Sequence, residues 1–144
     1  MTPLASGPHV PFAVPFKTDH ATFVLGPYDY VEYKYHLAQG ATLLYAWEAT
    51  TTVIQDFHGA AEGPHAGAEI SVDKSSAPRG SGSLAAPFSG MHGWYWENPG
   101  GSTVTVTITT AGYYSTAIEY RSDRTRIVHD LNTGASAARP GASK

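Results

Sequence analysis

Apolar and polar residues alternate at every second position along much of the chain. Residues 31–37 show this most simply, because charged or polar residues separate four apolar ones: Val31, Tyr33, Tyr35 and Leu37. A period of two is typical of a β-strand with one buried and one solvent-exposed face. Residues 43–47 carry apolar side chains on both faces, which predicts a central strand. Residues 104–109 alternate Val or Ile with Thr and form the strongest strand pattern of the chain.

The same reasoning predicts further short strands, and no segment has a sustained apolar period of 3.6 residues. The expected strands cover residues 53–58, 68–72, 83–88, 91–97, 113–120 and 124–129. Gly, Ser and Pro predict loops at 59–67 and 73–82. About eight to ten short strands joined by tight turns predict an all-β fold, a single antiparallel β-sandwich of jelly-roll character, with a closed barrel as the alternative.

The two ends of the chain differ from its middle. Residues 1–18 carry four prolines, a spacing that blocks a helix or an inner strand and predicts a Pro-rich arm whose apolar residues pack on the domain. Residues 132–144 offer little to bury and predict a flexible tail. The β-sandwich domain is therefore expected at residues 19–131.

Composition excludes several classes of function. The 144 residues hold 9 Lys and Arg against 12 Asp and Glu, so no basic field is present to collect phosphates, and nucleic acid is excluded as a partner. The chain has no cysteine, which removes disulfides, thiolate metal sites and cysteine nucleophiles. No run approaches the ~20 apolar residues that a membrane-spanning helix requires.

Two histidines and a carboxylate suggest a metal site. His58 ends one expected strand, His92 lies on another beside Trp94 and Trp96, and Glu69 lies between them in sequence. Side chains from separate strands can converge on one face of a sandwich, and this donor set suits one divalent transition metal, zinc or copper. His65, in a Gly-rich loop, is a weaker candidate. The competing interpretation is that such histidines only bond to backbone carbonyls within the fold.

Catalytic and sugar-binding functions are alternatives with less support. No Gly-x-Ser-x-Gly elbow is present, so no catalytic residue is predicted. A small jelly-roll metalloenzyme would use the same His58, Glu69 and His92. Nine Tyr and three Trp on a small β domain also fit a carbohydrate-binding module, in which exposed rings stack on sugars.

Four segments resemble a family of bacterial proteins described as transmembrane anchor proteins. The segments are VEYKY at 31–35, GATLLYAW at 40–47, QDFHG at 55–59 and APFSGMHGWYWEN at 86–98, and the resemblance extends over about residues 19–120. It implies the soluble part of a membrane-tethered protein on the extracytoplasmic side, periplasmic or at the cell surface. The order of segments is more distantly similar to the GOLD domain, a β-sandwich that mediates protein contacts and normally holds a disulfide, which this chain cannot form.

Together these features predict a non-catalytic extracytoplasmic binding or interaction domain of a membrane-anchored bacterial protein. Contact with a membrane is expected only through an anchor. An exposed edge strand could pair with a protein partner or with a second copy of the chain, giving a homo-oligomer.

Overall fold

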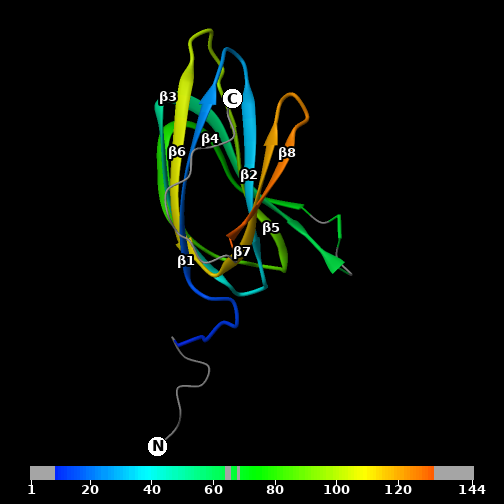
Figure 1. The fold of residues 1–144 in the computed structure, drawn as a ribbon. Coiled ribbons are helices and arrows are strands. Elements are labelled where there is room, and N and C mark those ends of the chain that lie inside the picture. The colour runs from blue at the N-terminus through cyan, green and yellow to red at the C-terminus, as the bar shows by residue number, and fades with distance from the viewer. Residues whose placement is uncertain (1–8, 64–65, 68, 132–144) are drawn as a thin grey trace, which may run out of the picture.

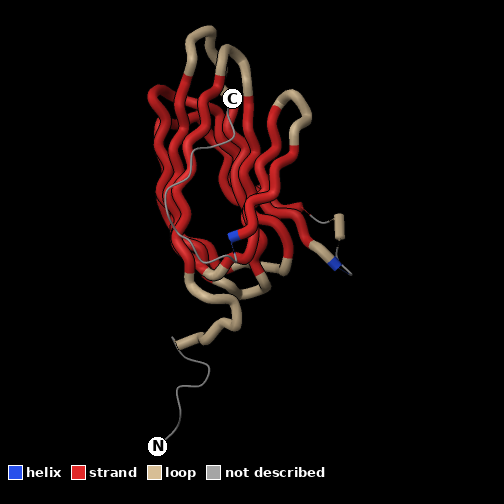
Figure 2. Tube along the Cα trace, in the orientation of Figure 1, coloured by secondary structure: helices blue, strands red, loops and turns tan. Residues whose placement is uncertain are grey.

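The fold is built from eight antiparallel strands, and the computed structural model describes residues 9–63, 66–67 and 69–131 (Figures 1 and 2). The strands are β1 (Lys17–Leu25), β2 (Tyr30–Leu37), β3 (Thr42–Ala61), β4 (Glu69–Ala85), β5 (Gly90–Glu97), β6 (Val104–Gly112), β7 (Tyr114–Arg121) and β8 (Arg126–Asp130). The predicted all-β, antiparallel, sandwich-like fold is confirmed. Within the described ranges, no helix has the length and apolarity needed to cross a bilayer.

A single long hairpin, β3–β4, joins the two layers of the sandwich. The first half of β3 pairs with β6, and its second half pairs with β5, while β4 accompanies both halves. The ladder is interrupted between Glu48 and Val53, where the hairpin turns from one layer to the other. Sheet I therefore consists of β1, β6, the first half of β3 and the second half of β4. Sheet II consists of β8, β7, β2, β5 and the remaining halves of β3 and β4. Figure 1 shows the resulting curled sheet.

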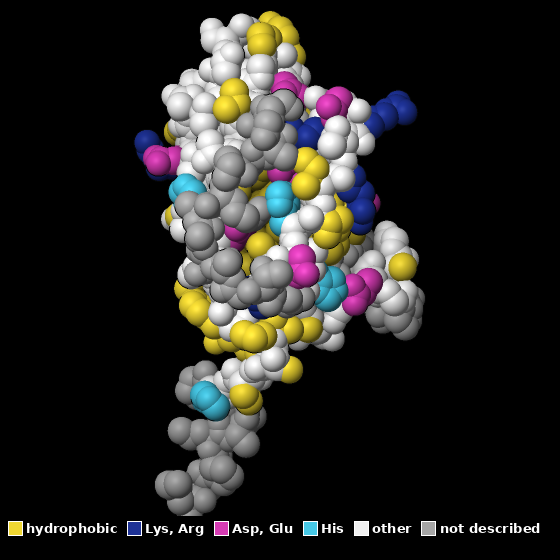
Figure 3. Space-filling model, viewed as in Figure 1, with side chains coloured by type: hydrophobic (Ala, Val, Ile, Leu, Met, Phe, Trp, Pro, Cys, Tyr) yellow, Lys and Arg dark blue, Asp and Glu magenta, His cyan; other side chains and the backbone are white. Residues whose placement is uncertain are grey.

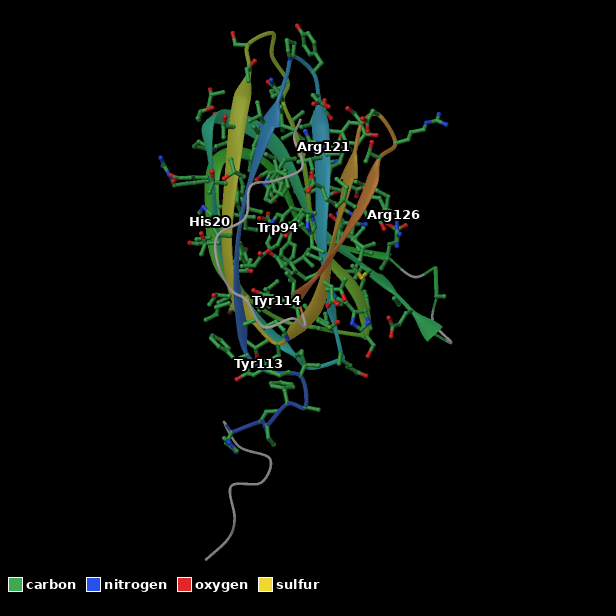
Figure 4. The ribbon with its side chains drawn as sticks, viewed as in Figure 1. His20, Trp94, Tyr113, Tyr114, Arg121 and Arg126 are labelled. Carbon is green, nitrogen blue, oxygen red and sulfur yellow. The ribbon has the colours of Figure 1, made fainter. Side chains whose placement is uncertain are left out.

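Aromatic side chains fill the space between the layers. Trp94 on β5 is fully buried and stacks on Phe57 with ring centroids 4.4 Å apart. Phe23 on β1 reaches across to Tyr33 on β2, with centroids 5.0 Å apart. Figure 4 shows Trp94 and Tyr114 inside the molecule, between the layers. The alternation at residues 31–37 predicted this inner face correctly, since its four apolar residues are all completely buried.

The core also holds two carboxylates, and both are hydrogen-bonded or ion-paired. The hydroxyls of Tyr33 and Tyr35 donate to Asp19 Oδ2 at 2.7 and 2.8 Å. Glu119 lies between Arg121, at 3.5 Å, and the imidazole of His129, at 3.2 Å. A buried carboxylate is tolerated when its oxygens find such donors.

The described part of the Pro-rich arm meets one end of the sandwich, where Phe12 is partly buried while Val10 and Phe16 are exposed. Phe12 and Phe16 lie 4.5 and 5.7 Å from the ring of Tyr113. Figure 3 shows apolar side chains gathered at this end of the visible face. β1 begins at Lys17, so the last two residues of the predicted arm belong to sheet I. The predicted tail, residues 132–144, lies outside the described residues.

Two predicted loops are wrong in whole or in part. Residues 73–82 belong to β4, and β3 continues through the Thr-rich residues 49–52 and on to Ala61. In the described chain β4 pairs with β3 alone, and most of its side chains are exposed, so it is an edge strand that tolerates the Ser, Gly and Pro of a loop-like sequence. Gly80 and Gly82 read as loop residues, but they leave room for the rings of Trp47 and Tyr45, which a Cβ would approach to 2.7 and 3.0 Å.

Candidate functional site

The structure does not bring the three predicted metal ligands together. His58 and His92 lie on adjacent strands, where His58 pairs with Gly93 and Gly59 pairs with His92. Because successive side chains on a strand point to opposite faces, the two imidazoles are separated by the sheet. His58 faces outward, and His92 faces the core. Within the described part of the chain, no three His, Asp or Glu side chains are grouped so that they could hold a metal ion.

His92 is a core residue. Its side chain is 2% exposed and stacks on Phe88 with centroids 4.8 Å apart. Gly59 leaves the space that the ring occupies, because a Cβ there would lie 2.7 Å from His92 Cδ2. Burial lowers the pKa of His92, although the backbone of Gly90 acts in the opposite direction. His92 is therefore packed within the core, remote from the outer surface, and neither of its buried ring nitrogens has a hydrogen-bond partner among the described residues.

His58 and Glu69 do share a site, on the outward face of sheet II. They line an open pocket of about 770 Å³, called here the sheet II pocket. Glu69 pairs with Ala60, two residues beyond His58, so the two side chains point to the same side. The polar residues of the lining are Glu32, Asp56, His58, Glu69, Ser71, Lys74, Tyr95 and Glu97.

The partner of His58 is Glu32 on β2, which is absent from the predicted metal site. His58 Nε2 lies 3.2 Å from Glu32 Oε2, and Nδ1 lies 3.1 Å from the backbone oxygen of Asp56. The hydrogen bond that His58 donates to Glu32 raises the pKa of His58, and the same bond lowers the pKa of Glu32. Both ring nitrogens donate when His58 is protonated, so the pair is a charge-assisted contact. The alternation at residues 31–37 puts Glu32 on the exposed face, and this is the one feature of the sequence that points to its role.

The other carboxylates of the pocket differ in their hydrogen bonds and ion pairs. Ser71 donates to Asp56 Oδ1 at 2.8 Å. Tyr95 donates to Glu97 Oε1 at 2.5 Å, and burial, followed by this carboxylate, raises the pKa of Tyr95. Glu69 is exposed and forms no ion pair with the described residues. Four carboxylates thus line the pocket together with the ammonium of Lys74 and the imidazole of His58, and Lys34 Nζ lies 3.5 Å from one of them, Glu32.

Replacement of the carboxylate beside His58 tests this geometry. In Glu32→Gln, the pKa of His58 is expected to fall, because the contact that contributes most to raising it loses its charge. NMR titration of the His58 ring protons measures the shift. Glu48→Gln removes a carboxylate from sheet I and serves as the control, with no change expected. An unchanged His58 titration in Glu32→Gln would contradict the ion pair.

The same pair predicts a pH window for stability. The folded pKa of His58 lies above its ordinary value of 6.5, so its contribution is complete below about pH 6.5 and is lost as pH rises through the folded pKa. The folded pKa of Glu32 lies below 4.5, so its contribution is present above about pH 4.5 and is lost as pH falls through the folded pKa. The ion pair of His58 and Glu32 therefore stabilises the fold most between about pH 4.5 and pH 6.5.

Comparison with known proteins does not assign this chain to a family. The sequence matches no protein-family model and no curated protein. The membrane tether, the extracytoplasmic location, the homo-oligomer and the GOLD-like relationship therefore stay predictions. His65 lies outside the described residues.

Proposed function

We propose that this chain is a non-catalytic binding domain, held by a membrane anchor on the extracytoplasmic side of a bacterial membrane, and that it takes a cationic ligand in the sheet II pocket. The resemblance of residues 19–120 to bacterial anchor proteins supports the location. The charge of the sheet II pocket supports the ligand class.

The hydrogen bonds within the pocket favour binding over catalysis. Groups that could transfer a proton are engaged with one another, since His58 is held by Glu32 and by Asp56, and Tyr95 donates to Glu97. The hydroxyl of Ser71 is bound to the Asp56 carboxylate, which does not activate it as a nucleophile in the way that an imidazole does. These contacts fix the side chains before a ligand arrives, which reduces the entropy cost of binding.

The excess of carboxylates is the observation that carries the proposed ligand class. Glu69 stands at the open side without an ion pair among the described residues, and Glu97 accepts a hydrogen bond through one oxygen. Tyr30 lies beside the pocket with its ring 5.3 Å from that of Tyr95, and both are half-buried. Ammonium groups bind to carboxylates and also to the faces of such rings. A basic segment of a protein partner has this chemistry.

Calorimetric titration with an oligolysine peptide tests the proposal. Binding is expected at an ionic strength of about 0.01 M and is expected to weaken at about 0.15 M, because the shorter Debye length screens exposed charges. The double variant Glu69→Gln, Glu97→Gln is expected to raise Kd at least about tenfold. Glu48→Gln, on the other layer, is the matched control and should bind as the parent chain does. Absence of binding at low salt, or equal binding by the double variant, would refute the proposal.

A further inference from the structure

Sheet I carries a second pocket on its own outward face. It has a volume of about 410 Å³ and is called here the sheet I pocket. Its polar side chains belong to four strands: His20, Glu48, Arg79, Ser81, Thr107 and Thr109. Figure 4 shows His20 at the outer surface, away from the core that holds Trp94. The pocket shares no lining residue with the sheet II pocket.

Strand register explains why the surface is hollow at this place. Ala46 lies in the middle, directly between Ser81 on β4 and Thr109 on β6. All three side chains are short, so they form a floor. Longer side chains of Arg79, Glu48 and His20 surround that floor. The register pairs Glu48 with Arg79, and His20 with Thr109. The hollow is thus built on paired strands, whose backbone is held more rigidly than that of a loop.

The polar groups around the floor keep hydrogen-bonding capacity for a ligand. Glu48 and Arg79 face each other in the register but form no ion pair within the described part of the chain. The guanidinium offers several donors, and the carboxylate offers acceptors. His20 Nδ1 is hydrogen-bonded to Thr109 Oγ1 at 2.9 Å, which orients the ring. Ser81 and Thr107 add hydroxyls that both donate and accept.

We propose that the sheet I pocket binds one unit of a neutral carbohydrate. A charged ligand is attracted by one of Glu48 and Arg79 and repelled by the other. The pair therefore adds little binding free energy for an anion or for a cation. A sugar hydroxyl both donates and accepts, and neighbouring hydroxyls can satisfy the carboxylate and the guanidinium at once. The threonine and serine hydroxyls extend the same pattern. The volume lies within the range of small-molecule sites.

Affinity electrophoresis tests the proposal with soluble neutral polysaccharides as probes, namely a β-glucan, an α-glucan, a xylan and a mannan. The parent chain is expected to be retarded by at least one of them. Arg79→Ala removes the guanidinium, and Ala46→Leu fills the floor. Each is expected to raise Kd at least about tenfold. Ala85→Leu makes the same exchange at an exposed β4 position of sheet I outside the pocket and is expected to bind as the parent does.

Amide chemical shifts identify the face that binds. The probe that retards the parent chain is expected to shift the signals of Arg79, Ser81, Thr107 and Thr109. No retardation by any neutral polysaccharide would overturn the proposal. So would retardation that persists in both pocket variants, shifts confined to the sheet II pocket, or retardation by anionic polysaccharides alone. Because Glu69 and Glu97 take no part, failure here is distinguishable from failure of the oligolysine experiment.

Discussion

Gly93→Ala is expected to destabilise the protein by about 3 kcal/mol or more, because the new methyl group has no space. A Cβ at Gly93 would lie 2.1 Å from the backbone oxygen of Tyr33 and 2.6 Å from Lys34 Cα. These are backbone atoms of β2, which cannot rotate away as the end of a flexible side chain can. β5 lies between β2 and β3, so relief requires that central strands separate.

Urea unfolding followed by circular dichroism measures this effect. Gly26→Ala is the matched control, since a Cβ at Gly26 meets nothing within 4 Å. The control is expected to unfold at the parent midpoint or slightly above it, because alanine restricts the unfolded chain more than glycine does. If the two variants had the same midpoint, the close approach of β5 to β2 described here would be wrong.

Trp94→Ala is expected to cost about 3–5 kcal/mol, the usual range for removing a large aromatic side chain from a core. Trp94 is completely buried and lies between three other rings, at centroid distances of 4.4 Å from Phe57, 4.8 Å from Tyr45 and 5.8 Å from Trp96. Its partners come from both halves of β3 and from β5. The cavity that Trp94→Ala leaves is therefore expected where the β3–β4 hairpin bends and meets β5.

Chemical unfolding, followed by the fluorescence of the remaining tryptophans, measures the loss in the free energy of unfolding. Phe16→Ala, at a residue of the arm that is 58% exposed, removes an aromatic ring from the surface and is expected to cost less than about 1 kcal/mol. The unfolding slope should stay near that of the parent chain for both variants. A Trp94→Ala midpoint within error of Phe16→Ala would mean that the ring is not part of a closely packed core.

Alternation along single strands was sufficient to predict which residues face the core. It placed Tyr33 and Tyr35 inside and Glu32 outside, and residues 43–47 were correctly predicted as a central strand. The prediction failed at residues 73–82, where Ser, Gly and Pro indicate a loop. Those residues form a strand because β3 supplies the hydrogen bonds and the aromatic rings that cover Gly80 and Gly82.

The separation of His58 from His92 follows from alternation as well. His58 comes directly after the core residue Phe57 and faces outward, whereas His92 is in phase with the buried Trp94 and Trp96. The contacts that form on the outward face depend on strand order and register, which no local pattern contains. Glu32 was assigned to the exposed face, but its contact with His58 crosses β5 and requires the order of strands.

The pairing of the first strand with the sixth affects how the chain folds as it is made. Lys17 pairs with Gly112 and Leu25 with Val104, so β1 has no partner until most of the sequence has been synthesised. The first half of β3 depends on the same late strand. Before that point, β1 and the first half of β3 lack their common partner β6, so sheet I cannot assemble. Such long-range pairing slows folding, because the entropy of closing a long loop is lost before the contacts between β1 and β6 form.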